Sequence, residues 1–214
     1  MDISDNNINN INAIDSSDIA RSMPPQRFTQ MAVVCYLSLT LVAIGWISLR
    51  EGEVLPGKYL FGNGLIRWQI GIGVCFAMVF VAISWLGHLC FEFIRRAECD
   101  IQTLLGELPV SHILVLACCS SIGEEALFRG ALQPTLGIWL TSAIFGVLHF
   151  PPTANLAFYP LLAALAGYGL GWLFDLTGGG LIAPIVAHFF INLVGLYRIA
   201  HLKNSTVEQN PEAR

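Results

Sequence analysis

The sequence predicts an all-α, polytopic transmembrane helical bundle, and three observations support this fold class. Hydrophobic residues make up 55% of the 214 residues, and charged residues only 12%. The mean hydropathy is +0.63, whereas a soluble domain usually carries about twice that charged fraction. Six apolar segments lack the alternation of a β-barrel strand. Because only helices and closed barrels satisfy their backbone in a bilayer, we expect about six membrane helices.

The chain is expected to contain four regions. Residues 1–30 are polar and rich in Asn, without the basic start and cleavage site of a signal peptide, and predict a flexible tail. Residues 31–107 predict two accessory transmembrane helices and connecting loops. Residues 108–200 predict a four-helix catalytic core, and residues 201–214 a polar C-terminal tail.

The six segments differ in polarity and length. The first two, 31–49 and 68–91, carry no charge, whereas the third, 108–133, contains three charged residues. The fourth, 135–150, stops at Pro151-Pro152. At about 1.5 Å per residue it spans only about 24 Å, so we expect it to end inside the membrane beside a water-accessible notch.

The fifth segment, 155–174, carries small residues at every fourth position, and the sixth covers 181–197. Such a ladder predicts close packing of helix backbones. The small residues are Ala163, Gly167 and Gly171.

The composition gives no sign of a basic surface that would bind phosphate groups. The net charge is −4 with 11 Lys and Arg residues, so we expect no nucleic-acid binding. The distribution of Lys and Arg outside the third segment favours both termini in the cytoplasm.

The six cysteines form no Cys-x-x-Cys pair and are expected to be buried small hydrophobic residues. They are Cys35, Cys75, Cys90, Cys99, Cys118 and Cys119.

Three charged residues lie deep in the third apolar segment. A charge at the bilayer centre costs several kcal/mol unless it pairs, faces a cavity or does chemistry. Glu125 and Arg129 are four residues apart on one helix face, and a structural ion pair explains them. Glu124 points about 100° away and is not covered by that pair, which favours a role in proton transfer.

Two further pairs of residues stand at four-residue spacing. Phe145 and His149 lie on the fourth segment, and His188 and Asn192 on the sixth. Depth is counted from the membrane face that holds the turn between the third and fourth segments and the turn between the fifth and sixth. On this scale Glu124 lies about 14 Å deep, His149 about 21 Å and His188 about 10 Å. We therefore expect these groups to converge in the middle of the bilayer if the third, fourth and sixth helices touch. The other histidines, His88, His112 and His201, are expected to have structural roles.

Three motifs carry a resemblance. Residues 124–129 read EExxxR, residues 145–149 FxxxH, and residues 188–192 HxxxN. In this order on apolar helices they resemble the CAAX protease and bacteriocin-processing family (CPBP, also called Abi) over about 110–197. The resemblance implies a multi-pass membrane protein, with the compact size suggesting the prokaryotic cytoplasmic membrane.

The resemblance also implies an intramembrane endopeptidase of the glutamate type. Glu124 is then expected to act as the general base on a water, helped by His149, with His188 and Asn192 as oxyanion donors. Accessory residues would be Glu125, Arg129 and Phe145. The implied partners are the lipid bilayer and a membrane-associated peptide or protein tail; the oligomeric state stays open.

Alternatives to this function stay open at the level of sequence. Two carboxylates and two histidines could bind zinc, although no HExxH helix is present, so hydrolysis without a cofactor or metal is favoured. A non-catalytic scaffold or immunity protein would keep these residues for packing. A proton pathway is disfavoured because the polar groups lie at one depth.

Overall fold

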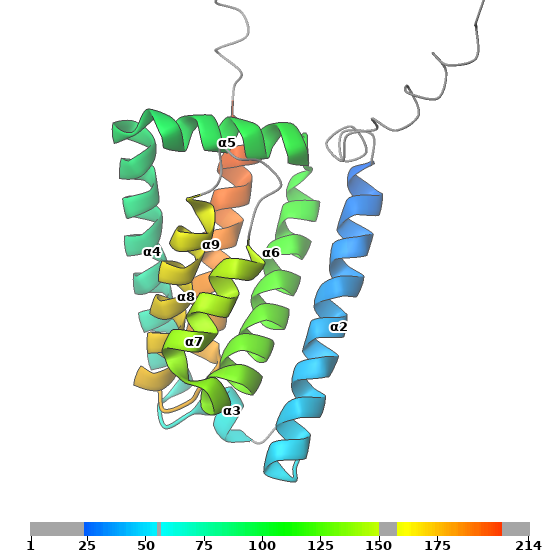
Figure 1. Ribbon diagram of the computed structural model, residues 1–214, viewed down its shortest axis with the longest axis vertical. Coiled ribbons are helices and arrows are strands. Elements are labelled where there is room, and N and C mark those ends of the chain that lie inside the picture. The colour runs from blue at the N-terminus through cyan, green and yellow to red at the C-terminus, as the bar shows by residue number, and fades with distance from the viewer. Residues whose placement is uncertain (1–23, 55–56, 150–157, 203–214) are drawn as a thin grey trace, which may run out of the picture.

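The computed structural model describes residues 24–54, 57–149 and 158–202, and every regular element among them is a helix (Figure 1). The all-α prediction is therefore confirmed. The elements are α2 (Pro25–Glu51), α3 (Gly57–Phe61), α4 (Ile66–Cys90), α5 (Glu92–Leu105), α6 (Val110–Glu125), the π-helical segment η1 (Ala126–Leu132), α7 (Gln133–Leu148), α8 (Tyr159–Leu176) and α9 (Ile182–Ala200).

Four helical stretches in the described part of the chain are long and apolar enough to cross a membrane. They are Pro25–Glu51, Ile66–Cys90, the continuous stretch Val110–Leu148, and Ile182–Ala200. The chain is thus an integral membrane protein, as its composition predicts. The fifth apolar segment forms α8, which is 18 residues long.

The first two predicted segments need correction at their ends. Helix α2 begins at Pro25 rather than at residue 31, because proline is well tolerated in the first turn of a helix. The expected connecting loop after the second segment contains the 14-residue helix α5. In Figure 1, α5 lies across the end of the bundle, roughly perpendicular to the spanning helices. Its mixed polar and apolar sequence suits this position and is not that of a membrane span.

The third and fourth segments also meet differently from the prediction. The chain stays helical through Gln133 and Pro134 and changes direction at Gly137, where φ is 77° and ψ is 163°. Pro134 does not break the helix because it lies in the first turn of α7. Glycine accommodates the positive φ without the clash of a Cβ atom. In Figure 1, α7 ends about half-way up the bundle, as the shortness of this segment predicts.

The remaining predictions of the sequence have different outcomes. All six cysteines are free, but five are exposed and Cys119 is half-buried, so the expectation that they are buried in the protein is wrong. All except Cys99 of α5 lie on the apolar helices α2, α4 and α6, where lipid rather than the protein core surrounds such side chains. Pro151-Pro152, residues 1–23 and residues 203–214 lie outside the described residues.

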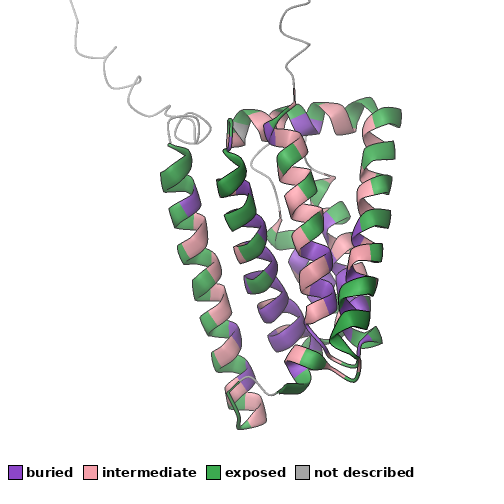
Figure 2. Ribbon diagram, turned by 180° about the vertical axis from the view of Figure 1, so that it is seen from behind, coloured by how far each residue is buried: buried purple, intermediate pink, exposed green. Residues whose placement is uncertain are grey.

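Helix α6 packs between α2 and α9, and other pairs of helices pack beside it. Helix α2 packs against α6, α6 against α9, α9 against α4, and α7 against α8. Buried residues concentrate on α6 and its neighbours, whereas α2 and α4 are mostly exposed (Figure 2). The beginning of α2 and the end of α9 lie at the end of the bundle crossed by α5 (Figure 1). The described chain therefore begins and ends on the same side.

The small residues of α8 allow close contact with α7, as predicted. A Cβ atom on Gly167 would lie 3.1 Å from Cδ1 of Phe145, and one on Gly171 would lie 2.6 Å from Oε1 of Gln133. Ala163 packs in a cluster with Phe128 and Phe145. The ladder thus brings α8 against the helix that carries the FxxxH motif.

Candidate active site

The two adjacent glutamates lie at the end of α6, immediately before η1. Glu124 is 7% exposed and Glu125 is fully buried. A π-helical segment changes the angular spacing of side chains from that of an α-helix, and such segments occur frequently at functional sites. The charged motif is therefore held where the helix geometry changes.

Glu125 forms a buried ion pair with Arg129, as its four-residue spacing predicts. Nε of Arg129 lies 3.2 Å from Oε2 of Glu125, and one guanidinium nitrogen donates to Oε1 at 3.3 Å. The other donates to the Gly167 carbonyl at 2.8 Å. Arg129 thus neutralises Glu125 and ties η1 to α8.

The ring of Phe145 packs over the guanidinium group of Arg129. Its ring centroid lies 4.8 Å from the guanidinium carbon of Arg129 and 4.8 Å from the ring of Phe128 in an edge-to-face arrangement. The ring of His149 lies 4.3 Å away. Phe145 therefore excludes water from the Arg129 charge and supports the imidazole.

His149 follows the last residue of α7 and faces Glu124. Its Nδ1 lies 2.7 Å from the Phe145 carbonyl oxygen, which can only accept a hydrogen bond, so Nδ1 carries the proton. Its Nε2 lies 3.7 Å from Oε2 of Glu124, and its side chain is 28% exposed. The imidazole is thus fixed through one nitrogen and presents the other to the acid.

His188 reaches the same carboxylate from α9. Its Nδ1 lies 2.6 Å from Oε1 of Glu125, and its Nε2 lies 3.8 Å from Oε2 of Glu124. The Glu125 carboxylate oxygen can only accept a hydrogen bond, so Nδ1 of His188 donates to it and the ring is held in place. Glu125 is therefore both the partner of Arg129 and the group that orients His188.

One oxygen of Glu124 has an unusual environment. Oε2 is buried and has no hydrogen-bond partner in the described part of the chain, yet Nε2 of His149 and Nε2 of His188 lie 3.7 Å and 3.8 Å from it. These separations are too long for direct hydrogen bonds. Contacts of this length between polar atoms are commonly bridged by water.

Asn192 lies one helical turn beyond His188 on α9. Its Nδ2 donates to Oγ of Ser120 at 2.9 Å, and Ser120 lies one turn before Glu124 on α6. The structure thus places Asn192 beside α6 but pairs it with a serine rather than with Glu124. An amide nitrogen has two N–H donors, so the second stays available.

Several residues near Glu124 were not singled out in the sequence. Ser120 supplies the acceptor for Asn192 just described. Tyr159 of α8 lies with its ring 6.4 Å from that of His149, and the backbone of Tyr36 in α2 packs against Gly123, the residue before Glu124. None belongs to a charged or repeated motif, and only the tertiary packing shows their position.

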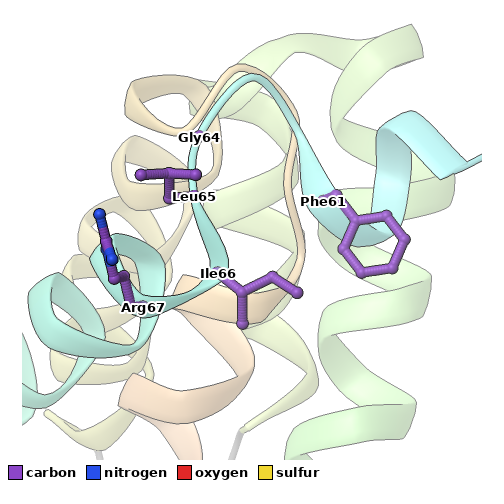
Figure 3. A pocket seen from close by; sticks show the side chains of 5 residues that line it. All are labelled: Phe61, Gly64, Leu65, Ile66 and Arg67. Atoms are coloured by element: carbon purple, nitrogen blue, oxygen red, sulfur yellow. The ribbon is translucent and has the colours of Figure 1, made fainter.

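The other features near the bundle surface are separate from this site. A hollow of about 600 Å³ beside the α3–α4 loop is lined by apolar side chains and Arg67 (Figure 3). It contains none of the motif residues. Within the described residues, no group of three or more His, Cys, Asp and Glu side chains is arranged to hold a metal ion.

The fold and this site define a class of protein: a polytopic membrane protein with a buried acid and two imidazoles brought together from three helical segments. Residues 106–194 match the family model of type II CAAX prenyl endopeptidase, Rce1-like. This region is therefore similar to the CAAX protease family that the three motifs resemble. Helices α2, α3, α4 and α5 lie outside the match.

A search of curated proteins finds a relative that covers part of the chain. The uncharacterized protein YpbD of Bacillus subtilis (strain 168) is 33% identical over 115 residues. The alignment covers 53% of this chain and 60% of that relative. No solved structure matches the chain.

Proposed function

We propose that the chain is an intramembrane endopeptidase that hydrolyses a peptide bond in a membrane-associated peptide or protein tail. One observation carries this proposal: a buried carboxylate oxygen of Glu124, without a hydrogen-bond partner among the described residues, faces two imidazole nitrogens at water-bridging distance. The match to a protease family supports the same activity.

Glu124 acts as the general base in the proposed reaction. A water between Oε2 of Glu124 and Nε2 of His149 would donate a hydrogen bond to each, leaving its oxygen lone pairs free to attack a carbonyl carbon. The water oxygen bonds to that carbon as the proton moves to Glu124. The carbon–nitrogen bond then breaks, and the proton passes to the departing amine.

The negative charge that develops on the carbonyl oxygen needs donors. Nε2 of His188 provides one in the form of the imidazole that carries a proton there, and Glu125 orients the ring through Nδ1. Asn192 provides the second through its free N–H. Fixed donors in a water-poor site stabilise such an oxyanion strongly, and loss of one commonly costs about a hundredfold to a thousandfold in kcat.

The substrate is expected to be apolar or anchored in lipid. The chain exposes many large apolar side chains on its membrane helices, and a net charge of −4 offers no basic surface for nucleic acid. A hydrophobic tail reaching the site within the bilayer fits both facts. We place the protein in the cytoplasmic membrane of a prokaryote.

The test uses the purified full chain in lipid nanodiscs. The substrates are a panel of fluorogenic peptides with either unmodified apolar tails or farnesylated C-terminal CAAX sequences. Glu124→Gln and His149→Ala should each lower kcat by about a hundredfold to ten-thousandfold, the usual contribution of a general base. Glu107→Gln is the matched control because Glu107 is exposed in the loop before α6. Normal cleavage by both folded site variants would refute the mechanism.

Metal dependence is tested on the same preparation. Activity should survive prolonged treatment with a chelator, and elemental analysis of the active protein should show no stoichiometric metal. Loss of activity on chelation with recovery on adding Zn²⁺ would favour the zinc alternative.

A further inference from the structure

Helices α6 and α9 meet through two polar pairs of side chains. The helices run in opposite directions, since α6 begins and α9 ends at the end of the bundle crossed by α5 (Figure 1). One pair joins Nδ1 of His188 to Oε1 of Glu125 at 2.6 Å. The other joins Nδ2 of Asn192 to Oγ of Ser120 at 2.9 Å. His188 and Asn192 are four residues apart, so both pairs lie along the same face of α9.

The contact between α6 and α9 becomes apolar beyond the second pair, toward α5. Ile113, Leu116 and Ala200 form a buried cluster there. Ser120 is itself only 4% exposed. An apolar side chain at this position would continue the packing, whereas the serine gives Asn192 a hydrogen-bond partner.

The hydrogen bonds of the Ser120 hydroxyl determine which end of the Asn192 carboxamide faces α6. The hydroxyl donates its one hydrogen to the Ala117 carbonyl oxygen at 3.3 Å. Its oxygen can then only accept a hydrogen bond, so the group that faces it must be the NH2 of Asn192. The flipped amide would set the carboxamide oxygen against the serine oxygen without a hydrogen between them. Ser120 thus selects one of the two orientations of the carboxamide.

This orientation decides whether Asn192 can act as a donor. The NH2 group carries two hydrogens. One is donated to Ser120, and the second stays available on a side chain that is only half-buried. A flipped carboxamide would place its oxygen where the NH2 group now lies. That oxygen offers no hydrogen to the negative charge that develops on a substrate carbonyl.

We propose that Ser120 is a positioning residue, which holds the Asn192 carboxamide in the orientation that donates to the oxyanion. The inference rests on the proposed function, and Ser120 acts through Asn192 without touching the substrate. Ser120 lies one turn before Glu124, so the helix that supplies the general base also orients a donor on α9. Glu125 orients His188 in the same way. Helix α6 therefore fixes both oxyanion donors of α9.

The first test is a kinetic double-mutant cycle with a cleaved peptide from the panel. Asn192→Ala should lower kcat by about a hundredfold or more, the usual cost of one lost oxyanion donor. Ser120→Ala should lower kcat by about threefold to tenfold, the factor that corresponds to one neutral hydrogen bond. KM should stay nearly unchanged, since the oxyanion forms only after attack on the carbonyl. In the Asn192→Ala background, Ser120→Ala should leave kcat unchanged, because the group that it positions is absent.

Ser121→Ala is the matched control for this cycle. Ser121 is 1% exposed, and its hydroxyl donates to the Cys118 carbonyl oxygen of the same helix at 3.0 Å. The substitution removes the same group from the next residue of α6, and kcat should stay at the wild-type level. A loss of kcat by the same factor with and without Asn192, or an equal loss in Ser121→Ala, would overturn the positioning role.

The second test measures the contact without any enzyme activity. Thermal unfolding in nanodiscs is recorded for the wild type, Ser120→Ala, Asn192→Ala and the double variant. The change in Tm caused by Ser120→Ala should be more destabilising in the wild type than in Asn192→Ala, because only the wild type has a hydrogen bond to lose. Equal changes in both backgrounds would overturn the proposal.

The outcomes separate the two proposals. If Glu124→Gln abolishes cleavage while Ser120→Ala keeps the wild-type kcat, or changes KM alone, the positioning role fails and the protease stands. If the wild type cleaves no peptide, the proposed function fails and the positioning role fails with it, whereas the thermal cycle still decides whether Ser120 holds the carboxamide.

Discussion

The buried ion pair at the centre of the bundle should be costly to break. Arg129 is 1% exposed and Glu125 is fully buried, so removing one partner leaves a charge that neither water nor lipid can solvate. Replacing Arg129 with Met keeps a long apolar side chain against Phe145 but removes the donors to Glu125 and to the Gly167 carbonyl. We expect a loss of stability of about 3–5 kcal/mol, the range measured when a buried pair loses one member.

A second variant separates charge from packing. Arg129→Met combined with Glu125→Gln removes both charges, so it should recover much of the lost stability, although His188 loses its charged partner. The assay is reversible unfolding of the nanodisc-purified or detergent-solubilised protein, with Lys58→Met as a control because the Lys58 side chain is 59% exposed. An Arg129→Met protein as stable as the wild type, or a double variant no better than the single one, would refute this reasoning.

Three further predictions follow from contacts elsewhere in the chain. Gly146→Ala should destabilise the α7–α8 pair by about 1–3 kcal/mol through overpacking, because the new Cβ would lie 2.5 Å from the Pro160 carbonyl oxygen. The control is Gly71→Ala, whose new Cβ has nothing within 4 Å, and its measured Tm should be equal to or higher than that of the wild type. The Arg95 and then the Arg96 guanidinium hold the pKa of Glu92 below its ordinary value of 4.5. Stabilisation by Glu92 is thus present above that value and lost as pH falls through the lowered pKa. Glu92→Gln should therefore lower the Tm at pH 7, and the difference from the wild type should shrink as the pH falls below 4.5; a constant difference would contradict this. Single cysteines introduced near Pro25 and Leu202, in a chain whose native cysteines are replaced, should be labelled from the same side of the membrane by an impermeant maleimide, and labelling from opposite sides would contradict the arrangement of α2 and α9.

The residues of the site were easier to predict from the sequence than the contacts and turns that bring them together. Charged residues in an apolar helix are expensive, so Glu124, Glu125 and Arg129 stand out in the sequence. Their four-residue spacing correctly predicted the ion pair. The pairing of His188 with Glu125 was not predictable, since helical periodicity fixes a face but not which of two adjacent carboxylates a partner helix meets.

The misplaced boundaries have a common physical cause. Hydropathy distinguishes apolar from polar segments, but it does not show where a helix that remains hydrogen-bonded changes direction. Gly137 turns the chain, while the more conspicuous Pro134 does not. Helix α5 was missed because its alternation of charged and apolar residues looks like a polar connection. Its long-range pairs, such as Glu98 with Arg198 and with His88, exist only after folding.

The helix that lies across the end of the bundle also sets a measure of depth. If α5 rests at the surface of the bilayer, Glu124 lies 14 residues along α6 from Val110, or at most about 21 Å below that surface. An extended polypeptide covers this distance in about six residues, and a helical one needs about fourteen. In the proposed activity, a tail anchored at the interface would then be cut at a position counted from the membrane boundary rather than chosen by the identity of its side chains.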